Sequence, residues 1–600
     1  MHNYKTTRRA LKLYHAYNPH YFPLSLLQMI FSHMTPFFNL WMSAEIVTAL
    51  YQKQTKKELF LLVAVTLSGN LFLHVMDAFL GRCVDTALKQ LNDNEAAAFN
   101  QKTLSLDYDK LENPEIRHLR RKIVENSWIQ GYGVRYMRCN LENIASCLVD
   151  IAYCIVMFAE MVSRIFRLAF DIRGVLLLIS IVVFVTLSVV VQSYCGKKQA
   201  DAWNSAGDLM LRENRLGGGY SQSGMDSRFY RQQEIVGKID KDLAEGHKKV
   251  YSRINNLDFA LRIPSYLFSK GSELCSYLVI ALYCSLGAFP VGSVIKYVGY
   301  LGLLTGNIGI LFFDLMELKN NEQFLETYLE YFDIKNDMYQ GSLSVEKRSD
   351  KQFDIEFKDV SFRYAGADEY ALKHISLNLK VGERLAVVGR NGSGKTTFIK
   401  LLCRLYDPTE GEIYMNDFNV RKYNYRQYLD LFSVVFQDYN LLAMPLGNNV
   451  ASAAHWDTVK AEQKLFEVGF GERYKEMPQK LETPLYKNFD EDGVNISGGE
   501  AQKIALARAL YRDAPFIILD EPTAALDPIA EAEIYSKFDE IVGDKTAIYI
   551  SHRLSSCRFC DKIAVFDAGE IIQAGTHEEL LADKNGKYYE LWHAQAQYYA

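Results

Sequence analysis

The chain has 600 residues, a formal net charge of −5 and 23% charged residues. This length predicts several domains, because single domains are usually shorter. The mildly acidic balance gives no indication of nucleic-acid binding, and an aromatic content of 13% is typical of a folded chain and argues against disorder. Ten cysteines without regular spacing predict no disulfide framework.

The first 320 residues carry nearly all the long apolar runs. The run at 174–196 contains no charged residue and is long enough to cross a bilayer. The basic N-terminal segment shows no pattern of a cleavable signal, and residues 7–20 are expected to form an amphipathic helix at the inner membrane interface. Six membrane spans are predicted, at about 22–48, 58–81, 142–163, 172–195, 263–288 and 293–315.

The segments between spans two and three, and between spans four and five, are long, charged and helical in pattern. They predict helices that extend the spans into water. Lys5, Arg8 and Lys12 precede the first span and favour a cytoplasmic N-terminus.

Several polar side chains lie inside the predicted spans. Such residues are candidates for a transport path, but they equally suit hydrogen bonds between helices, and the sequence leaves both interpretations open. They are His33, Asn39, Asn70, His74 and Asn307, with Asp77, Glu160 and Asp314 near span ends.

Residues 318–335 continue the last span as a polar helix, and 336–350 read as a linker. We therefore predict a membrane all-α six-helix domain over residues 1–335. An α/β domain of the P-loop type is predicted over residues 351–600, from the motifs that follow.

The most informative motif runs from Gly389 to Thr396 and reads G-x-x-x-x-G-K-T after an apolar strand pattern. In such a loop, backbone N–H groups converge on phosphate oxygens. Lys395 supplies positive charge, Thr396 can hold Mg²⁺, and a helix beginning at Lys395 adds the positive end of its dipole. The candidate nucleotide-binding residues here are Gly389, Asn391, Gly392, Ser393, Gly394, Lys395, Thr396 and Thr397.

Residues 515–521 read as a buried strand that ends in two carboxylates. Asp520 is a candidate Mg²⁺ ligand, and Glu521 is placed to act as the general base that polarises an attacking water. Gln437 follows another apolar run and offers an amide oxygen to Mg²⁺ or to water. His552, after the next strand pattern, suits contact with the terminal phosphate or that water.

Ser497, Gly498 and Gly499 begin a segment with helical apolar spacing. A serine followed by glycine N–H groups at a helix start forms a second anion site.

In this order the motifs resemble those of an ABC-transporter nucleotide-binding domain, over roughly residues 352–585. The resemblance implies that Tyr364 stacks on adenine, that Asp527 belongs to the D-loop, and that Glu521 and His552 are catalytic. It implies ATP and Mg²⁺ as cofactors. It also implies a dimer with two composite sites, in which the Ser497–Gly499 segment of one copy serves the nucleotide of the other. The signature departs from the family's commonest form at Ile496 and at Glu500, which replaces glutamine and adds negative charge near a triphosphate.

Combined with six spans, this resemblance implies an exporter-type half-transporter in a bacterial plasma membrane, with its ATPase domain in the cytoplasm. The expected partners are the lipid bilayer, a second half-transporter in a homodimer or heterodimer, and a transported drug, lipid, peptide or other small amphipathic molecule, with no nucleic acid. In this family short coupling helices contact the ATPase domains. Residues 113–117 resemble the first, and a segment near 223–231 is expected to hold the second.

Three alternatives remain. An importer with the exporter-like fold, for example for metal chelates, is not excluded by sequence, and neither is an ATP-gated channel. A DNA-associated ABC-type ATPase shares the motifs, but six spans and the lack of a coiled coil between loop and signature argue against it.

Overall fold

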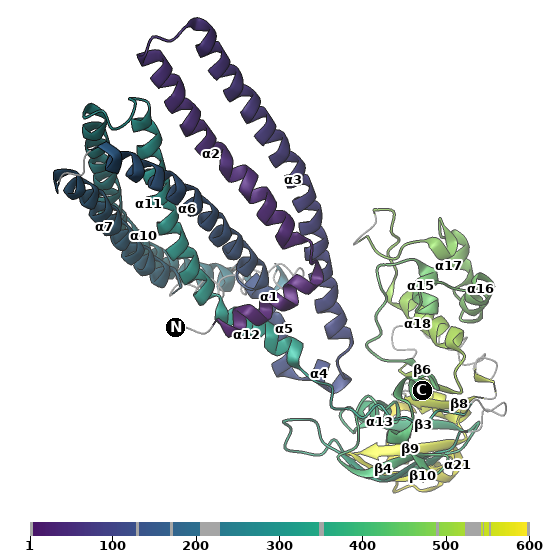
Figure 1. Cartoon of the computed structure of the whole chain (residues 1–600). Helices are drawn as coiled ribbons and strands as arrows, with labels where there is room; N and C mark the ends of the chain where they lie inside the picture. Colours follow the sequence, from purple (N-terminus) through teal and green to yellow (C-terminus); the bar gives the residue numbers. More distant parts are fainter. Residues whose placement is uncertain are drawn as a thin grey trace. The chain divides into compact units, whose positions relative to one another are not determined.

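The computed structural model describes residues 4–127, 131–168, 172–204, 228–346, 353–487, 491–521, 542–543, 545–550 and 554–596. Contacts divide the chain into two compact units (Figure 1). The first contains residues 1–106 and 114–335, and the second contains residues 107–113 and 336–600. The short segment 107–113 thus belongs with the C-terminal half of the chain, although membrane-domain sequence flanks it on both sides.

In its described residues the first unit is built from helices (Figure 1). Each of the six predicted spans falls on a long helix, and a short amphipathic helix precedes them as expected. The helices are α1 (Lys5–Tyr17), α2 (Tyr21–Tyr51), α3 (Lys56–Leu104), α5 (Pro114–Glu125), α6 (Val134–Leu168), α7 (Ile172–Asn204), α10 (Gln233–Ser285), α11 (Ser293–Asn320) and α12 (Glu322–Asp333).

By length and composition, four helical segments among the described residues can cross a membrane: Lys56–Leu104, Val134–Ile165, Leu176–Gln199 and Ser293–Asp333. The predicted span at 22–48 lies within α2, and the span at 263–288 lies on α10 up to the helix end at Ser285. Their sequences contain more polar groups, such as His33 and Lys270, so hydropathy alone separates them less clearly from water-soluble helices.

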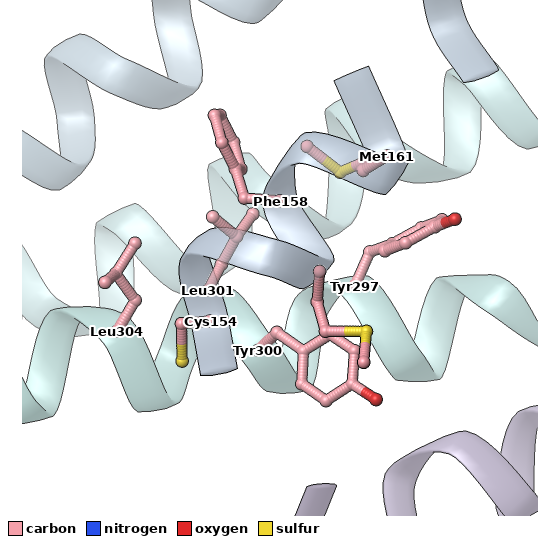
Figure 2. Close-up of a pocket in the computed structure, with 8 residues that line it drawn as sticks. Cys154, Phe158, Met161, Tyr297, Tyr300, Leu301 and Leu304 are labelled. Carbon is pink, nitrogen blue, oxygen red and sulfur yellow. The ribbon is translucent and has the colours of Figure 1, made fainter. Parts of the chain in front are cut away.

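Helices α6 and α11 pack tightly against each other. Figure 2 shows Cys154, Phe158 and Met161 of α6 beside Tyr297 and Leu301 of α11. The side chains leave a cavity of only about 10 Å³ between them, about the size of one water molecule. This contact is therefore part of the packed core of the helical unit and offers no room for a transported molecule.

The second unit holds two sheets. A four-stranded antiparallel sheet has the order β2-β1-β4-β5, and a six-stranded sheet has the order β10-β9-β3-β8-β7-β6, parallel except for β10. The strands are β1 (Ile355–Phe362), β2 (Leu372–Leu379), β3 (Arg384–Gly389), β4 (Glu410–Met415), β5 (Phe418–Asn419), β6 (Phe432–Val435), β7 (Phe516–Asp520), β8 (Thr546–Ile550), β9 (Lys562–Asp567) and β10 (Glu570–Gly575). Strands β7 and β8 are buried along their whole length, which explains their continuous apolar runs.

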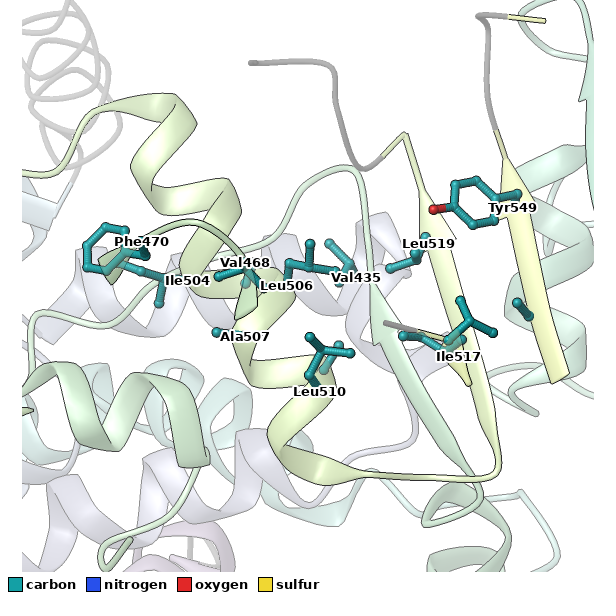
Figure 3. Close-up of a cluster of buried hydrophobic side chains, with 14 of the residues drawn as sticks. Val435, Val468, Phe470, Ile504, Leu506, Ala507, Leu510, Ile517, Leu519 and Tyr549 are labelled. Atoms are coloured by element: carbon teal, nitrogen blue, oxygen red, sulfur yellow. The ribbon is translucent and has the colours of Figure 1, made fainter. Parts of the chain in front are cut away.

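Helices of the second unit cover these sheets. They are α4 (Tyr108–Glu112), α13 (Lys395–Leu402), α14 (Tyr425–Leu429), α15 (Leu446–Ala451), α16 (Thr458–Glu467), α17 (Gly471–Glu476), α18 (Gly498–Arg512), α21 (His577–Ala582) and α22 (Lys587–Ala596), with 3₁₀ turns at Val420–Lys422, Lys480–Glu482 and Leu554–Phe559. Figure 3 shows the core that joins α18 to the parallel sheet, with Leu506 and Leu510 of the helix facing the strands. Phe470 lies in the same core beside Ile504, so the chain that leads into α17 is fixed against α18.

Residues 113–117, which resemble the first coupling helix, divide between two helices: they hold the C-cap of α4 (Tyr108–Glu112) and the start of α5. Asn113 caps α4, and Pro114 begins α5, because proline lacks an N–H and fits the first position of a helix. Most of the segment expected near 223–231 lies outside the described residues.

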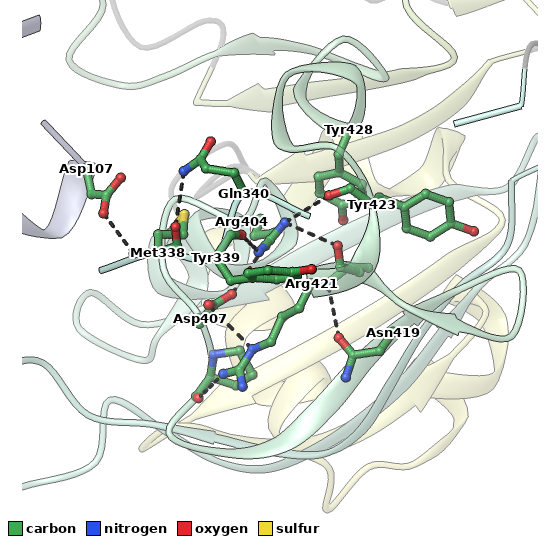
Figure 4. Close-up of polar contacts among 12 residues, drawn as sticks. Asp107, Met338, Tyr339, Gln340, Arg404, Asp407, Asn419, Arg421, Tyr423 and Tyr428 are labelled. Atoms are coloured by element: carbon green, nitrogen blue, oxygen red, sulfur yellow. Dashed lines mark hydrogen bonds and ion pairs between the residues drawn. The ribbon is translucent and has the colours of Figure 1, made fainter. Parts of the chain in front are cut away.

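The described part of the predicted linker, residues 336–346, is bonded to the rest of the second unit (Figure 4). Arg404 is 1% exposed and donates to the carbonyl oxygens of Tyr339, Val420 and Tyr423. The N–H groups of Ser342 and Leu343 both donate to the carbonyl of Lys422, at 3.0 and 2.9 Å. Specific hydrogen bonds therefore hold this segment against the second unit.

Replacing Arg404 tests this arrangement. We expect Arg404→Met to lower the thermal midpoint of the full-length protein by roughly 5–10 °C, because it removes a buried guanidinium that donates to three backbone carbonyl oxygens. The matched control is Arg421→Met. Both Arg404 and Arg421 pair with Asp407, but the Arg421 side chain is 45% exposed, so we expect a shift of about 2 °C or less. Equal shifts in the two variants, measured by intrinsic fluorescence on heating, would contradict the structural role of Arg404.

Candidate functional site

The phosphate-binding loop connects β3 to α13. Gly394 caps the helix with φ 101°, a conformation that favours glycine. A Cβ atom at this position would lie 2.6 Å from Leu372 Cδ2 and 2.8 Å from the carbonyl oxygen of Ala371. A Cβ at Gly389 would lie 2.3 Å from the carbonyl oxygen of Phe566. Glycine is thus required at both ends of the turn, by backbone conformation and by space.

Lys395 is almost fully buried in this loop. Its Nζ donates to the carbonyl oxygens of Gly389 and Arg390, at 2.9 and 3.0 Å. Burial lowers the pKa of the ammonium below its usual value, and the nearby carboxylates of Glu521 and Asp520 oppose that effect. The loop therefore already contains a desolvated positive charge surrounded by its own carbonyl dipoles, which is suited to an incoming phosphate.

The remaining loop residues divide by exposure. Asn391, Gly392 and Thr396 are exposed, whereas Ser393 and Thr397 are buried. The Ser393 hydroxyl has no hydrogen-bond partner among the described residues, and a phosphate oxygen would satisfy it.

Asp520 ends β7 and is 1% exposed. Its Oδ2 accepts a hydrogen bond from the Thr396 hydroxyl at 3.4 Å, and its Oδ1 has no partner in the part of the chain that the structure describes. Burial raises the pKa of this carboxyl to about 6, with the charge of Glu521 adding to the effect and Thr396 opposing it. A half-satisfied, buried carboxylate beside a hydroxyl is a hard oxygen pair that fits Mg²⁺.

Glu521 follows directly, in the left-handed region at φ 51°. Its backbone is fixed from two sides, since its N–H donates to Ile550 O at 3.0 Å and its carbonyl accepts from Gln502 Nε2 at 3.1 Å. Gln437 Nε2 donates to Glu521 Oε2 at 3.3 Å. Ile550 and Gln502 thus fix the backbone of the residue predicted to be the base, and Gln437 bonds its side chain. Strained backbone of this kind is common at functional sites.

These groups share one edge of the six-stranded sheet. Lys395 follows β3, Asp520 ends β7 with Glu521 directly after it, and Gln437 follows β6; these strands all run in parallel. The carboxyl ends of parallel strands in an open α/β sheet are where ligands bind.

Tyr364, predicted to stack on adenine, follows β1, and its side chain lies beside the first turn of α13. Its hydroxyl is 3.0 Å from Thr397 Oγ1, and its ring makes edge contacts with Phe362 and Tyr406. The aromatic ring is thus held beside the phosphate loop, as nucleotide stacking would require.

The signature segment forms the N-terminus of α18. Ser497 is the N-cap, and Glu500 completes a reciprocal capping box: the Ser497 side chain accepts from Glu500 N at 3.3 Å, and Glu500 Oε2 accepts from Ser497 N at 2.9 Å. Gly498 and Gly499 are the first helical residues, as the sequence predicts. Asp527 and His552 lie outside the described residues.

Sequence reasoning missed three residues that act on this site. Gln502 bonds the Glu521 carbonyl, Lys400 lies beside Tyr364, and Arg473 of α17 pairs with Glu500. Lys400 and Gln502 lie on helices whose apolar residues dominate the sequence pattern, and Arg473 lies on the short charged helix α17, so no motif singled them out. Only Gln502, two positions after Glu500 on the predicted helix, had a signal, since a glutamine buried there needs a partner.

In the helical unit, most of the predicted polar residues are paired across helices. His33 bridges Ser146 Oγ at 2.7 Å and Asp150 Oδ1 at 2.9 Å, and Asn70 Nδ2 donates to Asn39 Oδ1 at 2.7 Å. Glu160 pairs with Lys296, Gln28 donates to Asp77, Asn143 donates to Asp314, and Asn307 donates to its own helix at Leu303 O. His74 is exposed. These contacts favour the interpretation that the polar groups join helices.

A larger cavity lies between α7, α10 and α11. Its volume is about 220 Å³, and it combines glycine backbone with amide, guanidinium and apolar groups. Gln192, Gln199, Arg262, Gly306, Gly309 and Phe313 are among its lining residues.

Comparison with known proteins gives consistent results. Residues 372–524 match the family model described as ABC transporter. The subtilin transport ATP-binding protein SpaT of Bacillus subtilis is 35% identical over 57% of this chain and 55% of its own length. An ATP-dependent lipid A-core flippase of Mannheimia succiniciproducens is 40% identical over 44% of each chain. The chain therefore spans about half the length of the curated relatives it matches.

Over nearly the whole chain, the fold is similar to that of a bacterial Atm1-family ABC exporter solved with ATP bound. The TM-score is 0.71 at 20% sequence identity, covering 95% of this chain and 97% of the other. The predicted fold class, a helical membrane domain followed by a P-loop ATPase domain, is confirmed.

The pKa of Asp520 leads to a test that needs no turnover. A carboxyl whose pKa is raised on folding destabilises the folded state once it ionises, so its cost appears as pH rises through about 4 to 6. We expect Asp520→Asn to stabilise the nucleotide-free protein at pH 7.5 by about 2 kcal/mol, and by less at pH 5. The variant should also lose most of the extra stabilisation that Mg²⁺ adds to ATP.

Thermal midpoints with ATP plus EDTA and with ATP plus Mg²⁺ measure both effects. Asp430→Asn, an exposed carboxylate paired with Arg512, is the control and should show neither. A destabilised Asp520→Asn protein that still responds fully to Mg²⁺ would contradict the assignment.

Proposed function

We propose that this chain, an ABC-type exporter half with a fused helical domain and ATPase domain, works as a dimer that uses ATP to move a molecule across a membrane by alternating access. Residues 1–335 form the membrane domain, 336–350 the linker and 351–600 the ATPase domain. ATP binds the closed dimer more tightly than the open one, and hydrolysis returns the dimer to the open state.

The observation that carries this proposal is the meeting of Lys395, Thr396, Asp520, Glu521 and Gln437 at one sheet edge. A buried ammonium, an incompletely satisfied carboxylate and a fixed second carboxylate are the parts that phosphoryl transfer to water requires. The family match over residues 372–524 supports the same reading.

Each residue has a distinct part in the proposed reaction. Asp520, Thr396 and Gln437 would hold Mg²⁺, which neutralises charge on the phosphates when bound. Lys395 and the N–H groups of the loop bind those phosphates, with Tyr364 stacked on the adenine. Glu521 accepts the proton of the attacking water, assisted by His552. Asp527 and the segment Ser497–Gly499 of a second copy complete the site.

The segment 107–113, which membrane-domain sequence flanks on both sides, contacts residues next to this site. Lys400 Nζ is 3.0 Å from both carboxylate oxygens of Glu112, which also accepts from the Tyr406 and Tyr108 hydroxyls. The Lys400 Nζ lies 5.4 Å from the ring centroid of Tyr108 and 5.8 Å from that of Tyr364. One lysine thus contacts both helix α4 and the proposed adenine-stacking ring, which supports α4 as the coupling helix.

For the cargo, we propose a lipid, a peptide or another amphipathic molecule such as a drug, released from a bacterial plasma membrane. One relative is a subtilin transport protein and another is a lipid A-core flippase, so both classes occur among similar chains. The partner is a second half-transporter, identical or different, since this chain contains every motif that one composite site needs.

The central test is Glu521→Gln. Removing the base should leave Mg²⁺–ATP binding intact and lower steady-state hydrolysis by about 10²-fold or more, with the closed dimer accumulating. Hydrolysis by full-length protein in lipid nanodiscs, ATP binding and ATP-dependent cross-linking of the two copies measure these effects. Glu472→Gln, an exposed carboxylate on α17, should hydrolyse ATP at the normal rate. Near-normal turnover in Glu521→Gln would remove Glu521 from the role of base.

A further inference from the structure

The first turn of α18 carries a charge that its capping role does not need. Glu500 bonds the Ser497 N–H through Oε2, and a glutamine side chain makes the same capping box. The negative charge is therefore additional to the geometry. Under the proposed function, this end of α18 contacts the triphosphate that is bound to a second copy. The Glu500 carboxylate and that triphosphate are both negatively charged and would repel each other.

Arg473 is in position to offset this charge. Its Nε lies 2.9 Å from Glu500 Oε1, the carboxylate oxygen that the capping bond leaves available. The side chains of Arg473 and Glu500 are 35% and 26% exposed, so the pair is partly shielded from water. Arg473 Nη1 also donates to Glu476 one turn later, at 3.2 Å, which directs the guanidinium along α17.

The two helices are held together firmly enough for this contact to persist. Phe470 and Tyr474, on either side of Arg473, are buried in the core that contains Ile504 of α18 (Figure 3). Lys503 Nζ donates to the carbonyl of Gly469 at 3.0 Å, just before α17 begins. The other charged groups of α17 are Glu472 and Lys475, which pair with each other.

We propose that Arg473 is a positioning residue for the signature turn: it holds the Glu500 carboxylate against α17 and neutralises it, so that the Ser497–Gly499 turn can accept the nucleotide of a second copy. This inference rests on the proposed function. It adds that the acidic signature of this chain works only together with a basic residue on the neighbouring helix. In a chain with glutamine at position 500, the arginine would be dispensable.

The experiment is a double-mutant cycle on full-length protein in lipid nanodiscs, measuring ATP hydrolysis against ATP concentration. Arg473→Gln leaves the Glu500 charge uncompensated, so we expect KM for ATP to rise roughly three- to tenfold, with kcat changed less than about twofold. Glu500→Gln keeps the capping box and should leave KM within about twofold of the unmodified protein. The double variant should return to that value, and Arg473→Lys should keep most of the effect of arginine.

Ionic strength separates the electrostatic role from a structural one. The KM defect of Arg473→Gln should shrink as salt rises from about 50 to 500 mM, because screening weakens the repulsion. Lys475→Gln is the matched control, an exposed cation of the same helix, and should not change KM.

The inference falls if Arg473→Gln has a normal KM, or if its defect persists in the double variant and in high salt. Those outcomes differ from failure of the proposed function itself. That failure would appear as hydrolysis that survives Glu521→Gln, or as absence of ATP hydrolysis in the unmodified protein.

Discussion

The ATPase unit is organised around charges that are buried without being fully neutralised. Asp520 is 1% exposed with one carboxylate oxygen bonded only weakly to Thr396 and the other without a partner among the described residues. Lys395 is desolvated among backbone carbonyls of its own loop. Such groups are costly in a folded protein, and a nucleotide with Mg²⁺ would relieve both costs at once. The packing around the site must offset this cost, and β7 and β8 are buried along their whole length.

The same unit joins its ligand site to distant parts of the chain through buried polar contacts. Glu112 and Lys400 connect helix α4 to Tyr364, and Arg404 connects residues 336–346 to the segment after β5. Both basic residues lie on or directly after α13, the helix that begins with Lys395. A displacement of α13 on phosphate binding would therefore change the contacts of both α4 and the linker. Lys400 and Arg404 make these contacts directly.

Helix α18 shows how one residue can serve stability and function in opposite directions. A carboxylate in the first turn stabilises the helix through its cap and its dipole, but it disfavours a second anion at the same place. In the proposed role, the ion pair with Arg473 allows both, because the guanidinium neutralises the Glu500 carboxylate and leaves its capping bond to Ser497 in place.

The sequence alone was enough to predict the features that depend on local residue patterns. The loop Gly389–Thr396, the strand ending at Asp520, the helix after Ser497 and the positions of six long helices are read from spacing and hydropathy, because each needs only neighbouring residues to form. Only the tertiary structure decided which side chains meet. Gln437 and Glu521 are 84 positions apart, and Arg473 and Glu500 are brought together by the packing of α17 on α18. Residues 113–117 resemble one short coupling helix in sequence, but in the structure α4 ends at Glu112 and Pro114 begins α5. That α4 belongs to the second unit depends on contacts with residues nearly 300 positions away, such as Lys400. Adjacent residues encode the preference for helix, strand or turn. Which charged side chains meet in a site depends on which helix and strand faces pack against each other in the folded chain.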